Sequence, residues 1–470
     1  MREIVLDTLL TLERGESYSH MLVKAVLDKY DYLEARDKAF FKRLTEGTQE
    51  RRLELDYYLD YFSSVPVKKM KPLIRCLLRM SVYQLLYMDN VPDSAVCNEA
   101  CKLAAKRGFC GLRGFVNGIL RTIAKEREKL PLPDEEEALA YLSVKYSMPE
   151  WITGEWLEDY GRDITERLLR ALLDIHPVCL RMSSRAAREE REAVCGRIRE
   201  KGVGITQSPY LPYLYILGHT EGPAALPGFA EGKFIVQDVS SALAVEAALI
   251  REGDFVIDVC ASPGGKSLLA AEKAGTGRVL SRDISEEKVE RIAENVLRMR
   301  AENIETEIFD GSGTDERLAG RADVVLLDVP CSGLGVVGKK RDIKYRLQAD
   351  SCRDIEMLQR QIVRASAGYV KPGGILLYST CTIRREENED MVRFIVGELG
   401  FTPMPLEGIL PRRVFEERDR LEEDMRRAGR EPGKGLTEAE KKACIQILPG
   451  YMKADGFFIA RFRRAEETDG

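Results

Sequence analysis

In the second half of the chain, short apolar runs alternate with segments of helical periodicity. Each run has the length of one strand, and the first five are FVIDVC, RVLSRD, IETEIF, DVVLLD and GGILLYS. A repeat of strand, helix and strand forms right-handed crossovers, so the strands become parallel and helices cover the sheet. CIQILP and GFFIARF predict two further strands near the end. We therefore expect a Rossmann-like α/β domain over residues 232–466.

The first half of the chain has a different pattern. Residues 1–130 carry apolar side chains at three- and four-residue spacing, as in LIRCLLRMSVYQLLYMD, which predicts an all-α bundle. KLPLPDEEE then breaks the periodicity and is typical of a linker. Residues 136–231 combine a helix at Trp151–Tyr160, a strand-like PVCLRMS, a charged helix AAREEREAVCGRIREKG and the turn-rich LPYLYILGHTEGPAALPGF. This mixture predicts a small α+β module.

One segment near the C-terminus is dominated by charge. RRVFEERDRLEEDMRRAGREPGKG, at residues 412–435, is dense in both signs of charge and poor in apolar anchors. We interpret it as a mobile insertion at the surface.

Cysteine and histidine usage bears on the compartment and on metal binding. The chain has 11 cysteines without a CxxC pair, and its three histidines, His20, His176 and His219, are scattered. Both features favour reduced thiols in the cytoplasm and no metal site. The N-terminal residues lack the pattern of a signal peptide, and no apolar run reaches the roughly 18 to 20 residues of a membrane span.

The net charge of −5 excludes a wholly basic surface, so any RNA binding has to use local patches. Two groups of cations are close together in the sequence. Taken alone, each is more simply explained as a solvated helix face. The groups are Lys68, Lys69 and Lys71, and Lys102, Lys106, Arg107, Arg113 and Arg121.

A glycine turn follows the first expected strand. ASPGGKS comes directly after FVIDVC, so Gly264 and Gly265 lie at the carboxyl end of that strand, where helix amides begin. The spacing is neither the GxGxxG of dinucleotide sites nor the GxxxxGK[ST] of phosphate loops, which disfavours a dinucleotide or ATP. Asp283 ends the next strand, where it can accept both ribose hydroxyls of an adenosine, and Asp310 ends the third, beside the adenine.

Two cysteines follow the fourth and fifth strands. LLDVPCSGLG presents Asp328 and Cys331, and LYSTCTIRREEN presents Cys381 with Glu386, Glu387 and Asn388 a few residues later. A single free cysteine is usually an inert core residue. Two of them on adjacent strand ends, facing an expected nucleoside cofactor, are a more specific constellation.

Methylation of cytosine at carbon 5 explains why thiols would be needed. Carbon 5 is a poor nucleophile, but a thiolate that adds to carbon 6 creates an enamine that can attack a sulfonium methyl group. A base then removes the carbon 5 proton and the thiol leaves. A carboxyl group such as Asp328 suits the ring nitrogen N3 and the amino group N4, where charge develops. Lys266 is a candidate for the positive charge that activates the thiol.

The motifs DVCASPGGKS, DVPCSGLG and STCTIRREENE resemble those of the RNA cytosine-C5 methyltransferases of the NOL1/NOP2/Sun family. FIVQDVSSAL, RDIKYR and DGFFIARF extend the resemblance. ARDKAFFKRLTEGTQERR and GFVNGILR are similar to a NusB-type RNA-binding domain, so residues 1–130 are expected to be NusB-like. Members with this fusion methylate cytosine 967 of 16S rRNA, and the resemblance covers essentially the whole chain.

The resemblance implies roles for individual residues. Cys381 would attack carbon 6, Cys331 would assist proton removal or product release, and Asp328 would complete the catalytic set. Arg181, in the strand-like PVCLRMS, would contact RNA. S-adenosylmethionine would be held by Cys260, Ala261, Ser262, Pro263, Gly264, Gly265, Lys266, Asp283, Asp310 and Asp328. The family usually has Ser and then Pro after the nucleophile, where this chain has Thr382 and Arg385; the second change alters loop stiffness rather than chemistry.

Together these observations predict a cytoplasmic, monomeric enzyme that methylates carbon 5 of a cytosine in 16S rRNA, as free or early-assembly RNA, without DNA or membrane partners. A tRNA cytosine methyltransferase is one alternative, and the N-terminal domain argues against it. A non-catalytic RNA-binding assembly or antitermination factor is another. Retention of both cysteines, Asp328 and the glycine turn argues against that reading.

Overall fold

The computed structural model describes residues 1–15, 18–174, 177–218, 220 and 222–466, so His176 and His219 lie outside the described residues. The chain forms two compact units. The helical unit comprises Met1–Leu173 with Val337–Leu347, and the second unit comprises Asp174–Val336 with Gln348–Gly470. Within the described ranges, no helix is long and apolar enough to cross a membrane. The three-domain division expected from the sequence stays a prediction.

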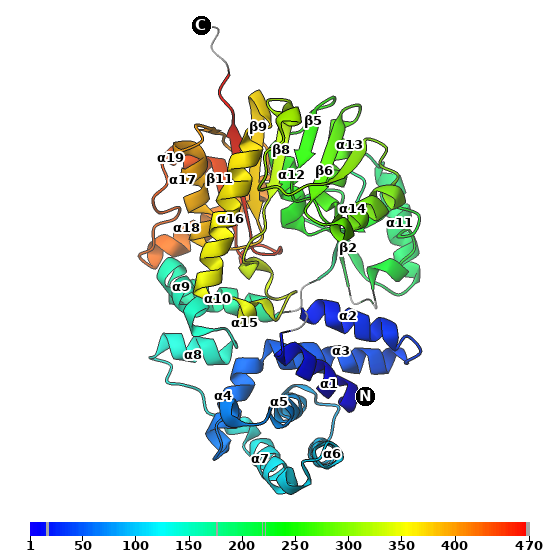
Figure 1. Cartoon of the computed structure of the whole chain (residues 1–470), viewed down its shortest axis with the longest axis vertical. Helices are drawn as coiled ribbons and strands as arrows, with labels where there is room; N and C mark the ends of the chain where they lie inside the picture. Colours follow the sequence, from blue (N-terminus) through cyan, green and yellow to red (C-terminus); the bar gives the residue numbers. More distant parts are fainter. Residues whose placement is uncertain (16–17, 175–176, 219, 221, 467–470) are drawn as a thin grey trace. The chain divides into compact units, whose positions relative to one another are not determined.

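The first seven helices of the helical unit pack around one apolar core (Figure 1, blue to cyan). Helix α5 is buried along most of its length and contacts α1, α3, α4, α6 and α7, so it forms the centre of the bundle. The helices are α1 (Arg2–Glu13), α2 (Ser19–Lys29), α3 (Ala35–Glu50), α4 (Arg52–Phe62), α5 (Pro72–Tyr87), α6 (Asp93–Lys106), α7 (Arg113–Lys125), α8 (Ala138–Lys145), α9 (Glu150–Tyr160) and α10 (Arg162–Leu173), with short 3-10 turns η1 (Val67–Lys69), η2 (Cys110–Leu112) and η3 (Arg127–Lys129).

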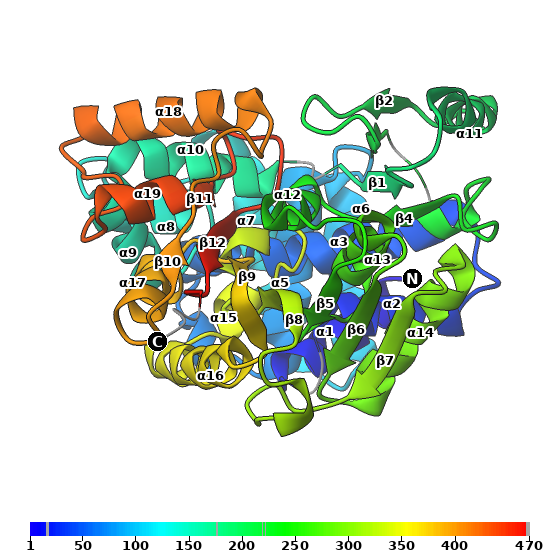
Figure 2. The ribbon, with the colours of Figure 1, turned by 90° about the horizontal axis from the view of Figure 1, so that it is seen from above.

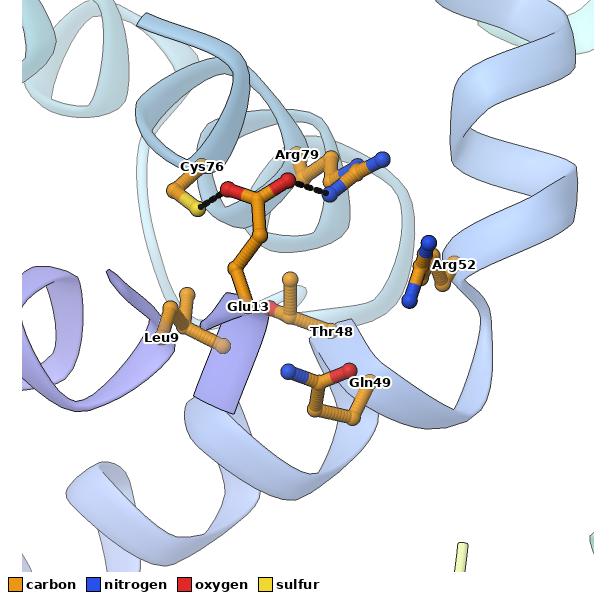
Figure 3. A pocket seen from close by; sticks show the side chains of 7 residues that line it. All are labelled: Leu9, Glu13, Thr48, Gln49, Arg52, Cys76 and Arg79. Atoms are coloured by element: carbon orange, nitrogen blue, oxygen red, sulfur yellow. Dashed lines mark hydrogen bonds and ion pairs between the residues drawn. The ribbon is translucent and has the colours of Figure 1, made fainter. Parts of the chain in front are cut away.

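A polar cluster ties α1 to α5 inside the helical unit. Figure 3 shows the Glu13 carboxylate between Cys76 and Arg79 in a small pocket. The Cys76 thiol donates to Glu13 at 2.9 Å, and the Arg79 guanidinium lies 3.2 Å from Glu13 and 2.6 Å from Asp56. Burial and the neighbouring Glu13 carboxylate raise the pKa of Cys76, so this thiol stays protonated and serves packing rather than chemistry.

Residues 337–347, which follow the PC motif, belong to the helical unit rather than to the sheet unit. This segment includes α15 (Ile343–Arg346). The Lys344 ammonium donates to the carbonyl of Glu50 at 2.9 Å, and the Tyr345 hydroxyl lies 3.0 Å from that of Ser147. Burial lowers the pKa of Lys344 to about 7. The chain therefore leaves the second unit after the PC motif, anchors in the helical unit, and returns.

The second unit contains a small four-stranded antiparallel sheet in the order β2-β3-β1-β4. One helix, α11 (Arg188–Glu200), supplies the apolar cover. The segment expected to be rich in turns contains a strand of buried side chains, β3, so that interpretation was wrong there. Strand β4 pairs with β1, although the sequence division places them on opposite sides of residue 231. The strands are β1 (Cys179–Met182), β2 (Ile205–Gln207), β3 (Leu214–Leu217) and β4 (Phe234–Val236).

The large sheet of the second unit has the order β10-β12-β9-β8-β5-β6-β7, with β11 paired to β12 (Figure 2). Strands β5 to β9 pair with one another in parallel, as expected, whereas β12 pairs antiparallel with β9, β10 and β11. The strands are β5 (Phe255–Asp258), β6 (Arg278–Asp283), β7 (Ile304–Ile308), β8 (Ala322–Asp328), β9 (Val370–Thr380), β10 (Thr402–Pro403), β11 (Cys444–Ile447) and β12 (Phe457–Arg463).

Helices cover both faces of this sheet. Successive strand residues point to opposite faces, so Val324 and Leu326 of β8 enter one apolar cluster while Val325 and Leu327 enter the other. The first cluster contains α12 (Val239–Ala248) and α13 (Gly265–Ala274), and the second contains α16 (Ala349–Ala367) and α17 (Glu389–Gly397). Figure 2 shows α12 and α16 on opposite sides of the sheet. Helix α14 (Glu286–Met299) connects β6 to β7.

The charged segment at residues 412–435 is ordered as a helix over most of its length, so the prediction of a mobile insertion was wrong. Helix α18 (Arg412–Arg427) buries Val414, Leu421 and Met425, which recur at helical spacing and were too sparse to be recognised among the charges. Its buried Glu417 accepts a hydrogen bond of 2.7 Å from the hydroxyl of Tyr210. The shorter α19 (Glu438–Ala443) precedes β11.

Candidate active site

The glycine turn after β5 brings backbone amides to the carboxyl edge of the sheet. Gly264 adopts a left-handed φ of 94°, and a Cβ there would lie 3.2 Å from a methyl carbon of Ile292. Gly265 begins α13, so the free amides of that helix point toward the same edge. The turn thus offers hydrogen-bond donors that a ligand can approach closely.

Asp283, the last residue of β6, stabilises the glycine turn by hydrogen bonding. Its carboxylate accepts from the amide of Ser262 at 3.0 Å, from the amide of Ile284 at 2.8 Å and from the Lys288 ammonium at 2.9 Å. Its position agrees with the expected one at the strand end. Asp310 lies just after β7, where its carboxylate accepts from the amide of Ser312 at 2.9 Å. Within the described part of the chain, Asp310 makes no hydrogen bond to the other expected site residues.

Carboxylates outnumber ammonium groups where the turn meets β8. The Lys266 ammonium lies 2.6 Å from the Asp328 carboxylate. Asp258, buried at the end of β5, accepts from the Ser267 hydroxyl at 2.6 Å, and its second oxygen has no partner among the described residues. Burial raises the pKa of Asp258 to about 6. With Asp283 nearby, this edge of the sheet favours a cation, and the positively charged sulfonium of S-adenosylmethionine fits that electrostatic environment.

The two cysteines expected to act together are brought together. The Cys331 sulfur lies 3.1 Å from the Cys381 sulfur, one beyond the end of β8 and the other beyond the end of β9. The amide of Gly335 donates to the Cys381 carbonyl at 3.0 Å and holds the two loops in register. The hydrogen bond to Cys381 and burial raise the pKa of Cys331 well above its usual value, so Cys331 keeps its proton.

Lys266 lies within electrostatic reach of this thiol pair. Burial alone would lower the pKa of Lys266, but Asp328, Asp258 and Cys381 raise it, so the ammonium stays charged. It also lies over the ring of Phe457, with 5.4 Å between the ammonium and the ring centroid. Lys266 is therefore a positive charge paired with Asp328 and within electrostatic reach of Cys381, and its role in activating the thiol stays a prediction.

A buried carboxylate, Glu387, links the two cysteine loops. One oxygen accepts from the amide of Ser332, next to Cys331, and from the Gln359 side chain, each at 2.9 Å. The other oxygen accepts from the hydroxyl of Thr382, next to Cys381, at 3.4 Å. Gln359 also donates to the carbonyl of Pro330 at 2.9 Å. Glu387 thus positions both thiols through their neighbours, a role that the sequence did not reveal.

This network predicts a graded response to substitution of Glu387. Alanine should lower kcat by about 100-fold, because small displacements of reacting groups have effects of that size, and should leave the KM for RNA nearly unchanged. Glutamine, which keeps one acceptor oxygen, should recover most of the loss. Methyl transfer by purified variants with matching thermal stability measures this. Glu386→Ala, at a neighbouring half-exposed side chain, is the control. Equal kcat values for Glu387→Ala and wild type would contradict the positioning role.

Two further side chains near the cofactor edge were missed. Asp258 stands inside an apolar strand run, and an acid in such a run was the available signal. Gln237 packs against Gly265, and its side-chain oxygen is buried with no partner among the described residues. A buried acceptor beside the glycine turn is suited to a ligand that brings its own donor.

Arg181 does not have the expected position. Its side chain is 0% exposed, and its guanidinium pairs with Glu272 of α13 at 2.6 Å. The expectation of an RNA contact was therefore wrong, because the strand β1 that carries Arg181 is buried on both faces. The ion pair joins the small sheet to helix α13.

The arrangement as a whole defines a class of protein. A parallel sheet with a glycine turn after its first strand, acids on the following strand ends and helices on both faces is the architecture of S-adenosylmethionine-dependent methyltransferases. The 16S rRNA methyltransferase RsmB/F family matches residues 247–463, and the NusB family matches residues 1–125.

Relatives extend the similarity to the whole chain. The probable ribosomal RNA small subunit methyltransferase B of Bacillus subtilis is 34% identical and covers 99% of this chain and 98% of its own length. The protein of the same name from Synechocystis is 30% identical, with 99% of each chain covered. The crystal structure of the protein PH0851 superimposes with a TM-score of 0.77 and 25% identity, over 98% of this chain and 97% of that chain. The chain belongs to the RsmB/F family of 16S rRNA methyltransferases, whose methyl donor is S-adenosylmethionine.

Proposed function

We propose that this enzyme transfers a methyl group to carbon 5 of a cytosine in 16S rRNA, the one corresponding to position 967, through a covalent bond between Cys381 and carbon 6. The observation that carries the proposal is the pair of sulfurs 3.1 Å apart at the ends of β8 and β9. A methyltransferase that acts on nitrogen or oxygen needs no nucleophilic thiol, whereas attack at carbon 5 needs activation of carbon 6.

In the proposed reaction the Cys381 thiolate adds to carbon 6 and makes carbon 5 nucleophilic. Asp328, held by the Ser379 hydroxyl at 3.0 Å and by Lys266, faces N3 and N4 of the base. S-adenosylmethionine supplies the electrophilic methyl group to carbon 5. A base then takes the carbon 5 proton, and the electron pair of that bond re-forms the double bond between carbons 5 and 6. The bond from carbon 6 to sulfur breaks at the same time, and its electron pair returns to the sulfur of Cys381. Cys331, which keeps its proton, is placed to protonate the departing sulfur.

The remaining sequence expectations are part of the same proposal. The target base leaves its stack to reach the sheet edge, since carbons 5 and 6 are otherwise covered by neighbouring bases. The cofactor contacts are made by Cys260 to Lys266 with Asp283, Asp310 and Asp328. The enzyme acts in the cytoplasm, as a monomer, on free or early-assembly rRNA; all 11 cysteines are free thiols, which suits a reducing compartment.

Bisulfite sequencing of RNA from a strain without this gene tests the substrate. We expect the cytosine corresponding to position 967 of 16S rRNA to lose protection while all other 16S positions stay unchanged, and the wild-type gene to restore it. Protection that persists at this cytosine would refute the assignment. Protection lost instead in tRNA would identify the enzyme as a tRNA methyltransferase, with the same thiol chemistry.

A further inference from the structure

The α6–α7 region of the helical unit differs in charge from the rest of the chain. Residues 100–125 contain six cations and no carboxylate, although the chain as a whole has a net charge of −5. Three of the six are neutralised by acids elsewhere. Lys102 pairs with Glu99 at 2.9 Å, and Lys106 pairs with Glu3 at 2.7 Å. Arg107 pairs with Asp7 of α1.

The other three cations lie on one stripe of α7. Arg113, Arg121 and Lys125 are exposed, and they are separated by multiples of four residues, so they share one face of the helix. Asn117, the intervening position of the stripe, accepts a hydrogen bond of 3.2 Å from Arg121. No carboxylate pairs with these three cations among the described residues. The nearby Asp93 is paired with Arg127.

Three further lysines precede α5, and one of them, Lys71, lies near the start of α7. Lys68 and Lys69 are exposed on η1, and the Lys71 ammonium lies 5.5 Å from the ring centroid of Phe109, which immediately precedes η2 and α7. None of the three has a carboxylate partner in the described part of the chain. The α7 basic face consists of Arg113, Arg121 and Lys125 on the helix, with Lys71 near its start.

Two glycines lie on α7 next to these cations. Gly114 and Gly118 are exposed within the helix, and a Cβ at either one would meet nothing within 4 Å. Glycine is among the poorest helix formers, so folding of this helix would favour alanine at both positions. Packing among the described residues gives no reason for the small size of these two positions. Binding of a polyanion against the helix would explain the two glycines, since the polyanion could approach the bare backbone between the cations.

We propose that the α7 basic face binds the phosphodiester backbone of the rRNA substrate. The inference rests on the proposed function only for the class of substrate. Unpaired cations arranged along a helix, next to an open backbone, suit a chain of phosphates better than a single anion or an apolar protein surface. The contact carries no sequence information, so it adds affinity while the sheet edge selects the base.

A charge-neutral triple variant tests this surface. We expect Arg113→Gln, Arg121→Gln and Lys125→Gln together to weaken binding of transcribed 16S rRNA by at least about tenfold near 0.15 M salt, and to reduce the slope of log Kd against log salt by roughly 2 to 3, because each lost phosphate contact removes about 0.7 to 0.9. The matched control replaces Lys24, Lys29 and Arg36, which are exposed cations of α2 and α3. An equal loss in both variants would overturn the proposal.

A second variant separates binding from folding. Gly114→Ala with Gly118→Gln should raise the melting temperature, since both positions are helical and open, and yet weaken rRNA binding several-fold. If both this variant and the triple variant bound rRNA as tightly as wild type, the proposal that the α7 basic face binds RNA would be wrong. Binding is measured without methyl donor, so it is independent of catalysis. If the wild-type enzyme methylates 16S rRNA and the variants bind RNA as tightly as wild type, the proposed RNA-binding surface is wrong and the proposed function stands. If the variants bind RNA more weakly but the wild-type enzyme does not methylate 16S rRNA, the surface stands and the proposed function is wrong.

Discussion

Replacement of Cys381 by alanine should reduce methyl transfer to 16S rRNA by at least about 1000-fold, as expected when a covalent nucleophile is lost. The thiol lies beside the permanent charge of Lys266 and contacts the protonated Cys331, and no other thiol of the described chain has both neighbours. Transfer of tritiated methyl groups from S-adenosylmethionine measures the loss. RNA binding should stay near the wild-type value, since alanine removes only one sulfur atom.

A matched control for this substitution is Cys195→Ala. Cys195 is buried on α11 in the core of the small sheet, and burial raises its pKa to about 11, so its thiol is unreactive at neutral pH. This variant should transfer methyl groups at the wild-type rate once its thermal stability has been matched. If Cys381→Ala kept substantial methyl transfer, or if only Cys331→Ala lost methyl transfer, Cys331 would be the attacking thiol.

The parallel arrangement of the central strands and the position of both thiols could be predicted because each rests on local patterns. Strand-sized apolar runs alternating with helices specify parallel neighbours, so Cys331 and Cys381 at the ends of consecutive runs had to meet at one edge. The glycine turn and Asp283 followed from the same reasoning. These features depend on residues that lie at or directly after each strand end in the sequence.

Features that depend on distant partners could not be predicted. Glu387 acts by accepting from the amide of Ser332, 55 residues earlier in the chain, and no local pattern records such a bond. Arg181 looked like an RNA contact until its partner, Glu272, was known. Helix α18 was mistaken for a mobile segment because three apolar side chains among many charges are enough to anchor a helix when a core is already present.

Replacement of Cys331 by alanine should leave the attack intact and trap its product. The Cys331 sulfur lies 3.1 Å from the Cys381 sulfur, and this hydrogen bond together with burial raises the pKa of Cys331, so Cys331 keeps its proton. Without this donor, the sulfur bonded to carbon 6 leaves as an unprotonated thiolate, and breakdown of the adduct should slow by about 100- to 10,000-fold, the range for loss of one general acid. Incubation with 16S rRNA and S-adenosylmethionine should therefore accumulate a covalent protein–RNA species that survives denaturing electrophoresis.

The trapped species has a second requirement, which makes the result specific to this pair of thiols. In the double variant Cys331→Ala with Cys381→Ala no adduct should form, because the attacking sulfur is gone. Glu387→Ala combined with Cys331→Ala should form the adduct more slowly, since Glu387 holds the Ser332 amide and the Thr382 hydroxyl on either side of the two loops. A Cys331→Ala enzyme that turns over freely and leaves no adduct would contradict the release role. In that case the 3.1 Å contact between the sulfurs would serve to position Cys381 before attack.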